Sequence, residues 1–167
     1  MIDYENLKLK GQLCFALYAA ANAITRAYRA SLRKVGLTYP QYLVLLALWE
    51  ADVKTVNGIA QRLYLDSAAL TPLLKRLERT GLIVRQRSVK DERVVNVSLT
   101  AEGRALKNKA PQIQAAVSCQ TGLSLTEMVK LRNNLHQLVA TLGRNQQRGK
   151  ATAKMMQVAS PSPPLEE

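Results

Sequence analysis

The sequence is poor in the residues on which disulfide scaffolds, metal centres and many enzymes depend. Its 167 residues include 2 cysteines, 1 histidine, 1 tryptophan and 1 phenylalanine. Two cysteines are too few for a secreted disulfide scaffold. The chain has no CxxC pair, no His–Asp constellation and no glycine-rich phosphate loop, so we expect neither an enzyme nor a resident cofactor. The lone His136 gives no support for a metal site.

Long apolar segments are also missing. No uninterrupted apolar run reaches the length of a bilayer-spanning helix, so we expect no membrane span. The opening MIDYENLKLKG is not followed by the apolar core or the small-residue cleavage site of a secretory signal. Together with the scarcity of cysteine, these features predict a cytoplasmic protein.

What the sequence has in excess is positive charge. It contains 24 Lys and Arg against 12 Asp and Glu, which gives a formal net charge of +12. Such an excess favours a polyanionic partner, either nucleic acid or an anionic membrane. Charge alone does not choose between these two, and a soluble protein that is merely basic is the alternative.

Helical periodicity organises most of the chain. Apolar residues spaced by three and four predict a long first helix that stops at Gly36, and the almost wholly apolar second helix must be buried. Further along, Thr100 caps one helix and a capping box from Ser124 to Glu127 opens the last one. The predicted helices cover residues 9–35, 38–49, 56–63, 101–118 and 124–142.

One more helix is predicted over residues 67–80, directly after the helix that ends at residue 63. Asp66 or Ser67 is suited to cap it. Pro72 removes one backbone hydrogen bond from a helix that starts at Ser67, so a later start at Thr71 stays open. The two consecutive helices with a tight turn between them are typical of a helix-turn-helix.

A hairpin follows this pair of helices. Residues 82–87 and 94–99 alternate between apolar and polar side chains as strands do, and they flank a charged loop. A helix-turn-helix followed by a hairpin is the outline of a winged-helix domain. The sequence therefore predicts a mainly α fold with a small β-hairpin wing.

The helix over 67–80 and the hairpin loop supply the candidate DNA contacts. A helix in the major groove turns its N-terminal residues to base edges, and later basic residues lie near phosphates. Ala68 is small enough to touch thymine methyl groups. The loop suits phosphates or a narrow minor groove, with Asp91 expected to pair with the Arg93 guanidinium. A solvated surface is the alternative for each residue. The predicted contacts are Ser67, Ala68, Thr71, Lys75, Arg76, Arg87, Lys90, Asp91 and Arg93.

Two segments resemble the MarR family of dimeric winged-helix regulators. They are GLTYPQYLVLLALWE (36–50) and LDSAALTPLLKRLERTGLIVRQRSVKDERVVNVSLTAEG (65–103), and the DER at 91–93 matches the family's wing signature. The resemblance covers about residues 7–143. It implies a bacterial homodimer that binds a pseudo-palindromic operator on double-stranded DNA and is released by an inducer.

The resemblance also implies how the chain is divided. Residues 1–143 form the family domain, with a winged helix-turn-helix core over 37–99 and dimerisation helices over 7–35 and 101–143. The last helix has an apolar face with no obvious cover in the monomer, which dimerisation would bury; the alternative is that the two terminal helices cover one another. The polar tail, 144–167, is expected to be disordered.

Within this family, the residues around Cys14 resemble the organic hydroperoxide sensors known as OhrR. The resemblance rests on LCFALYAA (13–20), TRAYR (25–29), LTYPQYLVLLALWE (37–50) and LDSAALTPLLKRLE (65–78). In that subfamily a cysteine of the first helix reacts with peroxide and two tyrosine hydroxyls hold it; the matching residues are Cys14, Tyr28 and Tyr39. Hydroxyl donors stabilise a thiolate, which attacks the O–O bond and becomes a sulfenic acid. An inert core cysteine is the alternative.

Cys119 resembles the second thiol of the two-cysteine version of these sensors. The resemblance implies a disulfide between Cys14 of one subunit and Cys119 of the other. A disulfide requires the two Cα atoms to lie close together, so its formation would move helices and weaken operator binding. If Cys119 is a bystander, a small cellular thiol caps the sulfenic acid instead.

Three other functions stay open at this point. One is a MarR-type regulator that is released by a phenolic or other small anionic ligand and whose cysteines are incidental. Another is a thiol peroxidase that is basic by chance. The third is an architectural protein that binds DNA with strong salt dependence and little sequence preference.

Overall fold

The computed structural model describes the backbone of residues 7–158 and the side chains of residues 7–145. The chain divides into two compact units, one that ends at Thr121 and one that begins at Gly122. None of the described helices is long and apolar enough to cross a bilayer. The elements of the first unit are η2 (Leu9–Gly11), α1 (Leu13–Arg33), α2 (Tyr39–Glu50), β1 (Val53–Thr55), α3 (Val56–Leu63), α4 (Ser67–Arg79), β2 (Ile83–Arg87), β3 (Val95–Leu99), α5 (Ala101–Ala105), η3 (Leu106–Lys109), α6 (Ala110–Ser118) and η4 (Cys119–Thr121).

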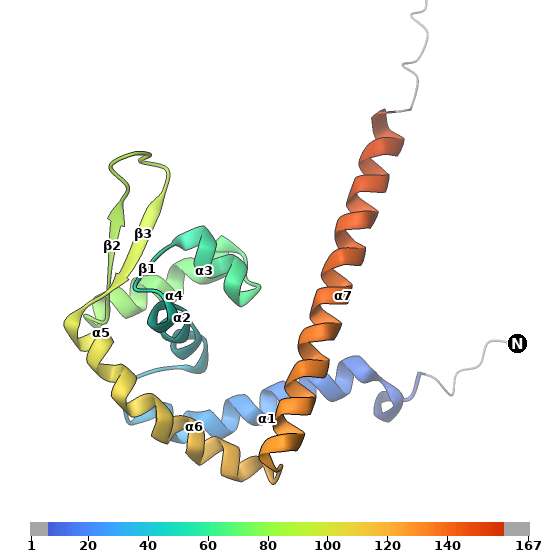
Figure 1. Cartoon of the computed structure of the whole chain (residues 1–167), viewed down its shortest axis with the longest axis horizontal. Helices are drawn as coiled ribbons and strands as arrows, with labels where there is room; N and C mark the ends of the chain where they lie inside the picture. Colours follow the sequence, from blue (N-terminus) through green and yellow to red (C-terminus); the bar gives the residue numbers. More distant parts are fainter. Residues whose placement is uncertain (1–6, 159–167) are drawn as a thin grey trace, which may run out of the picture. The chain divides into compact units, whose positions relative to one another are not determined.

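The core of the first unit lies between α2, α3, α4 and the sheet (Figure 1). The predicted burial of α2 is confirmed, because its apolar residues surround the helix and leave only a few positions for solvent. α3 and α4 each contribute one apolar stripe to this core. Its most deeply buried side chains are Leu32, Val44, Leu45, Leu48, Ile59, Leu70, Leu74, Leu77, Ile83 and Val97.

The predicted wing is present, and a third strand joins it. β2 pairs with β3 in antiparallel register, from Ile83 opposite Leu99 to Arg87 opposite Val95. On the other side of β3 lies β1, which the sequence analysis did not predict. β1 has 3 residues, too few for an alternating pattern to be recognised. The fold is therefore mainly α with a small sheet, as the sequence predicts.

The helix predicted over residues 101–118 is divided. α5 gives way to the 3-10 segment η3 before α6 begins. Pro111 has no N–H to donate to the Lys107 carbonyl, and the Ala110 N–H donates to it instead in the tighter 3-10 pattern. α6 then packs alongside α1 with Ile113 and Val117 buried.

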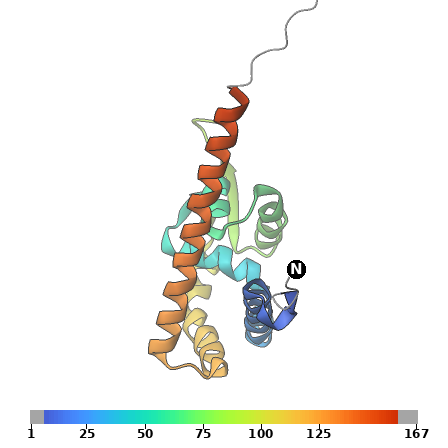
Figure 2. The ribbon, with the colours of Figure 1, turned by 90° about the vertical axis from the view of Figure 1, so that its right-hand side faces the viewer.

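The second unit is the single helix α7 (Leu125–Val158), seen as one rod in Figure 2. Its predicted capping box is confirmed, since Ser124 N donates to Glu127 Oε2 at 2.8 Å and Glu127 N to Ser124 Oγ at 3.3 Å. The helix was predicted to end at residue 142 and to be followed by a disordered tail. It continues through Val158, because Arg, Gln, Lys, Ala and Met favour helix although they are mostly polar. The rest of that tail, 159–167, lies outside the described residues.

Candidate nucleic-acid interface and thiol site

α4 presents two opposite faces, one apolar and one cationic. Asp66 caps the helix, because its Oδ1 accepts from the Ala69 N–H at 2.6 Å. The helix therefore begins at Ser67, and Pro72 lies inside it. Leu70, Leu74 and Leu77 are buried, whereas the predicted contacts Ser67, Ala68, Lys75 and Arg76 are exposed and Thr71 is half-buried.

The two hydroxyls of this face have their protons engaged inside the protein. Ser67 Oγ donates to Asn57 Oδ1 of α3 at 3.1 Å. Thr71 Oγ1 donates to the Ser67 carbonyl at 2.7 Å, the back-bond that threonine often forms in helices. Both residues keep acceptor lone pairs, but in this state neither offers a hydroxyl proton to a base.

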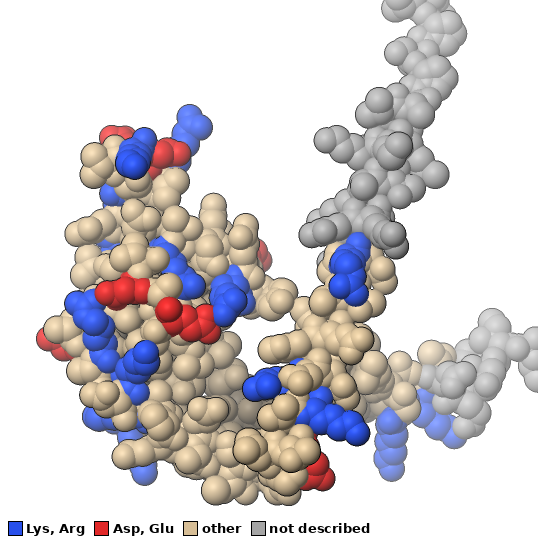
Figure 3. Space-filling model, viewed as in Figure 1, with Lys and Arg blue, Asp and Glu red and all other residues tan. Residues whose placement is uncertain are grey.

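The wing carries the other predicted cations at its end. Arg87 closes β2, and the loop after it is held by the Ser88 N–H donating to the Val94 carbonyl at 2.8 Å. Lys90 and Arg93 are exposed. Figure 3 shows basic and acidic side chains side by side at the wing tip, with further basic side chains below it.

The predicted ion pair between Asp91 and Arg93 is wrong. Among the described residues the Asp91 carboxylate accepts only from the Arg93 backbone N–H, at 3.0 Å, and not from its guanidinium. An aspartate that bonds the backbone two residues on forms an Asx turn, which competes with the side-chain pair. Asp91 therefore shapes the loop, and the Arg93 guanidinium is left for another partner.

A partly buried ion pair ties α4 to the wing. Arg85 of β2 donates from Nε to Glu78 Oε2 at 2.9 Å, and its backbone N–H donates to Glu78 Oε1 at 3.2 Å. The hydrogen bonds and charge of Arg85 lower the pKa of the Glu78 carboxyl below its ordinary value of 4.5. The sequence analysis missed this pair, because nothing in the spacing shows that the last turn of α4 faces β2.

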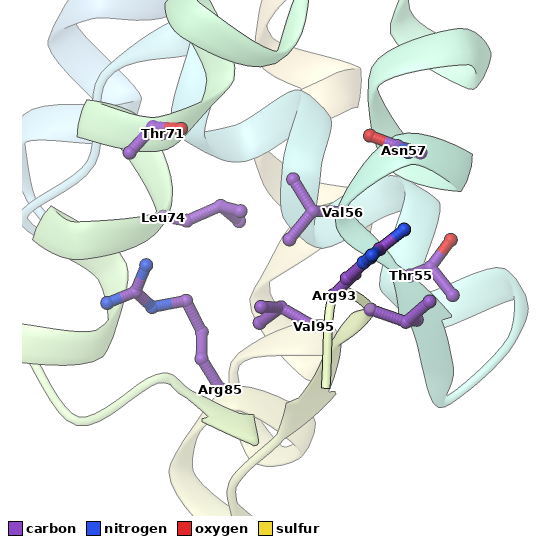
Figure 4. Close-up of a pocket in the computed structure, with 9 residues that line it drawn as sticks. Thr55, Val56, Asn57, Thr71, Leu74, Arg85, Arg93 and Val95 are labelled. Carbon is purple, nitrogen blue, oxygen red and sulfur yellow. The ribbon is translucent and has the colours of Figure 1, made fainter. Parts of the chain in front are cut away.

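A hollow of about 290 Å³ opens between α3, α4 and the wing. Thr71 and Leu74 line it from α4, and Arg85, Arg93 and Val95 line it from the wing (Figure 4). In this view Arg93 reaches from the wing toward Thr55 and Asn57 at the start of α3. The hollow lies directly beside the predicted DNA-contacting face.

The two cysteines are free thiols, and both are exposed. Cys14 lies in the first turn of α1, and Cys119 follows α6. Tyr28 is on α1 as well, 14 residues after Cys14, which is about 21 Å along a helix. The structure thus separates Cys14 and Tyr28 within one chain. The rise of a helix was sufficient to predict this separation from the sequence.

The predicted tyrosines, by contrast, lie together. The rings of Tyr28 and Tyr39 are 4.9 Å apart between centroids, and both side chains are half-buried. Burial is the main cause that raises the pKa of each phenol above 10.0, so both hydroxyls are protonated donors at neutral pH. Among the described residues neither hydroxyl has a hydrogen-bond partner.

Aromatic contacts continue from this pair to the base of the wing. Tyr42 lies 5.8 Å from Tyr28 and 6.0 Å from Trp49, between ring centroids. Trp49 Nε1 then donates to the Gly103 carbonyl of α5 at 2.9 Å. A chain of direct contacts therefore joins the tyrosines of α1 and α2 to the segment that follows the wing.

Comparison with known proteins gives consistent results. Residues 26–110 match the family described as transcriptional regulator SarA/Rot. The organic hydroperoxide resistance transcriptional regulator of Bacillus subtilis is 45% identical over 139 residues, which cover 83% of this chain and 95% of that protein.

Solved structures of transcriptional regulators also resemble this chain. Reduced AbfR bound to DNA has a TM-score of 0.70 at 35% identity and covers 86% of this chain and 98% of its own; AbfR is a protein of Staphylococcus epidermidis. Disulfide-formed AbfR has a TM-score of 0.55 at 35% identity, covering 86% of this chain and 95% of its own. Reduced MarR from E. coli has a TM-score of 0.64 at 25% identity, and the match covers 76% of this chain and 96% of MarR. The chain belongs to the winged-helix transcriptional regulators of the SarA/Rot and MarR type.

Proposed function

We propose that this regulator is a homodimer that binds operator DNA and releases it when an organic hydroperoxide oxidises Cys14. The observation that carries the proposal is the pair of half-buried, protonated phenols of Tyr28 and Tyr39, whose hydroxyls have no hydrogen-bond partner among the described residues. Two such donors are suited to stabilise a thiolate. The similarity to an organic hydroperoxide resistance regulator supports the choice of oxidant.

The dimer is supported by apolar side chains that the single chain leaves exposed. Leu13, Tyr18 and Ile24 are exposed on α1, and Leu125, Leu131 and Leu142 on α7. Exposed apolar surface of this extent marks an interaction site. A second copy of the chain would bury it.

A dimer would also explain how Cys14 can meet the two tyrosines although they lie far apart within one chain. Because Cys14 is about 21 Å along α1 from Tyr28, the phenols of one subunit cannot reach the thiol of the same α1. Antiparallel pairing of two α1 helices would bring the start of one helix to the end of the other. Each redox site would then combine Cys14 of one subunit with Tyr28 and Tyr39 of the partner subunit.

The chemistry at this composite site is a two-electron oxidation. The Cys14 thiolate attacks the terminal peroxide oxygen, a S–O bond forms, the O–O bond breaks, and the alkoxide leaves and becomes an alcohol on protonation. The sulfenic acid then reacts with the thiolate of the partner's Cys119. A disulfide forms, and hydroxide leaves and is protonated to water.

Oxidation would act on DNA binding through geometry. A disulfide holds its Cα atoms within about 7 Å, so closing one would move the first turn of α1 and the end of α6 toward each other. α1 carries Tyr28, from which the aromatic contacts lead to Trp49 and Gly103 below the wing. Two winged domains that change their separation no longer match half-sites about one helical turn apart.

On the DNA side, α4 would enter the major groove and the wing would follow the backbone. Ser67, Ala68 and Thr71 would face base edges, while Lys75 and Arg76 would lie toward phosphates. Arg87, Lys90 and Arg93 would reach phosphates or the minor groove. The net charge of +12 supports an anionic partner.

The hollow beside α4 favours a second candidate, release by a small anionic ligand. Arg85 and Arg93 both line it, but the Arg85 guanidinium is already paired with Glu78. Only the Arg93 cation would be available to the ligand without breaking that pair. An operator complex that resists organic peroxide but dissociates with an aromatic carboxylate would favour this candidate.

Mixed dimers test whether the redox site is shared between subunits. All chains carry Cys119→Ser, so that Cys14 is the thiol that reacts. A chain with Cys14→Ser is paired, through different affinity tags, with a chain that bears Tyr28→Phe and Tyr39→Phe. The remaining Cys14 then faces unchanged tyrosines from its partner, and we expect it to react with cumene hydroperoxide at the unmodified rate.

The matched control reverses the arrangement. A chain with Cys14, Tyr28 and Tyr39 unchanged is paired with one that carries all three substitutions. Its Cys14 should react more slowly by roughly tenfold for each hydrogen bond lost to a charged group. Equal rates in the two mixed dimers would contradict a site built from both subunits.

A further inference from the structure

A third tyrosine lies against the pair formed by Tyr28 and Tyr39. Tyr42 follows Tyr39 by three positions on α2, so the two side chains are neighbours on one face of that helix. Its ring centroid is 5.8 Å from that of Tyr28 on α1. The proposed function uses the phenols of Tyr28 and Tyr39 and gives no role to the third one.

The ring of Tyr42 belongs to the core, but its hydroxyl reaches the surface. The residue is 3% exposed, and its hydroxyl has no hydrogen-bond partner among the described residues. No fully buried side-chain oxygen or nitrogen in this part of the chain lacks such a partner. The Tyr42 oxygen must therefore keep a small contact with solvent, and its proton is not engaged inside the protein.

The three hydroxyls lie close enough for a charge on one to act on the others. Burial is the main cause that raises the pKa of Tyr28 above 10.0, and the charges of Tyr39 and Tyr42 raise it further. The pKa of Tyr42 is raised by burial and then by the charge of Tyr39. All three phenols are thus protonated donors at neutral pH, one more than the two assigned to the thiolate.

The reduction of a peroxide needs a donor at a second position. The attacking sulfur and the terminal peroxide oxygen start about 3–3.5 Å apart, and the leaving oxygen lies one O–O bond beyond, on the side away from the sulfur. Donors that hold the sulfur are therefore badly placed to serve the leaving oxygen. Tyr42 is displaced from Tyr39 by about 4.5 Å along α2, which is a displacement of the required size.

We propose that Tyr42 is a catalytic residue that gives its proton to the leaving alkoxide when Cys14 reduces an organic hydroperoxide, an inference that rests on the proposed redox function. The Cys14 thiolate attacks the terminal oxygen, which carries the hydrogen; the S–O bond of the sulfenic acid forms and the O–O bond breaks. The alkoxide takes the Tyr42 proton and leaves as an alcohol. The Tyr42 phenolate then regains a proton from water at its exposed edge. Sulfur loses two electrons and the peroxide gains them.

Such a donor matters most for peroxides whose leaving group is a strong base. An alkoxide leaves poorly without a proton, and a phenol is a stronger acid than an alcohol, so the transfer from Tyr42 is favourable. A peroxycarboxylic acid releases a carboxylate, a weak base that leaves as the anion. The contribution of Tyr42 should therefore depend on the leaving group of the oxidant.

The test compares two oxidants on the same variant. All proteins carry Cys119→Ser, and formation of the Cys14 sulfenic acid is followed by rapid quenching and mass spectrometry. Tyr42→Phe keeps the ring and removes the proton. We expect it to react with cumene hydroperoxide about a hundredfold more slowly, a usual contribution of general acid catalysis, and with peracetic acid at nearly the unmodified rate.

Two control variants separate this role from others. Tyr64→Phe removes a phenol that is 81% exposed and lies outside the cluster, so both rates should stay unmodified. Tyr28→Phe should slow both oxidants alike and move the midpoint of the pH dependence upward, because it acts on the pKa of the thiol. Tyr42→Phe should leave this midpoint in place.

The outcomes separate this inference from the proposal beneath it. If cumene hydroperoxide does not oxidise Cys14 of the protein with unmodified tyrosines, the proposed redox function fails and the role of Tyr42 fails with it. If Cys14 is oxidised but Tyr42→Phe slows both oxidants equally, or slows neither, the redox function stands and Tyr42 is only a packing residue.

Discussion

The substitution Gly103→Ala should loosen the joint between the wing and the helices that follow it. A Cβ atom at this position would lie 2.0 Å from the Leu82 carbonyl oxygen and 3.2 Å from Leu99 Cδ2. Since real contacts stay above 3.0 Å, α5 must move by about 1 Å, the difference between 3.0 and 2.0 Å. Because the closest atom is the Leu82 backbone oxygen, a change of side-chain rotamer cannot relieve the clash.

The magnitude follows from what this movement disturbs. Overpacking costs about 1–3 kcal/mol. The shift also strains two hydrogen bonds, from Trp49 Nε1 to the Gly103 carbonyl at 2.9 Å and from the Thr100 N–H to the Leu82 carbonyl at 3.2 Å, each worth about 1 kcal/mol. We expect a loss of about 3 kcal/mol, which lowers the melting temperature by about 6–12 °C for a chain of this length.

Thermal unfolding followed by circular dichroism measures this loss. Gly143→Ala is the matched control, because a Cβ there would meet nothing within 4 Å and alanine favours helix over glycine. The control should melt at the unmodified temperature or above it. A Gly103→Ala protein that melts within about 1 °C of the unmodified chain would refute the packing argument.

Three further predictions concern the wing, its tie to α4 and the turn between the two helices. Arg93→Ala should weaken operator binding by about 1–3 kcal/mol in anisotropy titrations; unchanged affinity would mean that this side chain is no contact. Glu78→Gln should lower the melting temperature at pH 7, and it should lower it less below pH 4.5. The pKa of Glu78 is lower in the folded protein than its ordinary value of 4.5, so the ionised carboxylate stabilises the fold above pH 4.5, and this stabilisation is lost as the pH falls through the pKa of the folded state. A constant difference across this range would contradict the ion pair as its source. Tyr64 has φ 54° and is 81% exposed, so Tyr64→Asn should raise the stability by up to about 1 kcal/mol, since asparagine adopts this left-handed conformation more readily. A lower melting temperature would show that Tyr64 makes a contact worth more than its strain.

Local rules were sufficient to predict most of the helices. The apolar stripe of α4, the cap by Thr100 and the capping box at Ser124 act over one or two turns, so their signals lie next to each other in the sequence. The start of α4 was open between Ser67 and Thr71, because a cap and a proline gave opposite indications. The Asp66 cap prevails in the structure.

The features that were missed depend on contacts between distant segments. β1 is stabilised by pairing with β3, some 40 residues later, and three residues carry no pattern of their own. The ion pair of Arg85 with Glu78 depends on the turn that brings β2 back along α4. Asp91 was predicted to pair with the Arg93 guanidinium, but its carboxylate accepts from the Arg93 backbone N–H instead. Two local donors compete for this one carboxylate.

At the proposed thiol site, too, some features followed from local sequence and others depended on contacts between distant segments. The residue types at Cys14, Tyr28 and Tyr39 were identified through a family resemblance, and the ring contact between the two tyrosines needs the packing of α1 against α2. The separation of Cys14 from Tyr28 along one helix required only the helical rise. The proposed site, which needs the thiol and both phenols, would therefore require residues from two subunits.

The most direct test of the redox account is release of DNA during a peroxide titration. Fluorescence anisotropy of a selected operator duplex is followed as cumene hydroperoxide is added from zero to two equivalents per subunit, with the unmodified protein, Cys14→Ser and Cys119→Ser. We expect release that is complete near one equivalent, reversed by dithiothreitol, absent with Cys14→Ser and, with Cys119→Ser, unaccompanied by a disulfide-linked dimer on a non-reducing gel. Equal release from Cys14→Ser, or retention of DNA by the unmodified protein, would contradict the account.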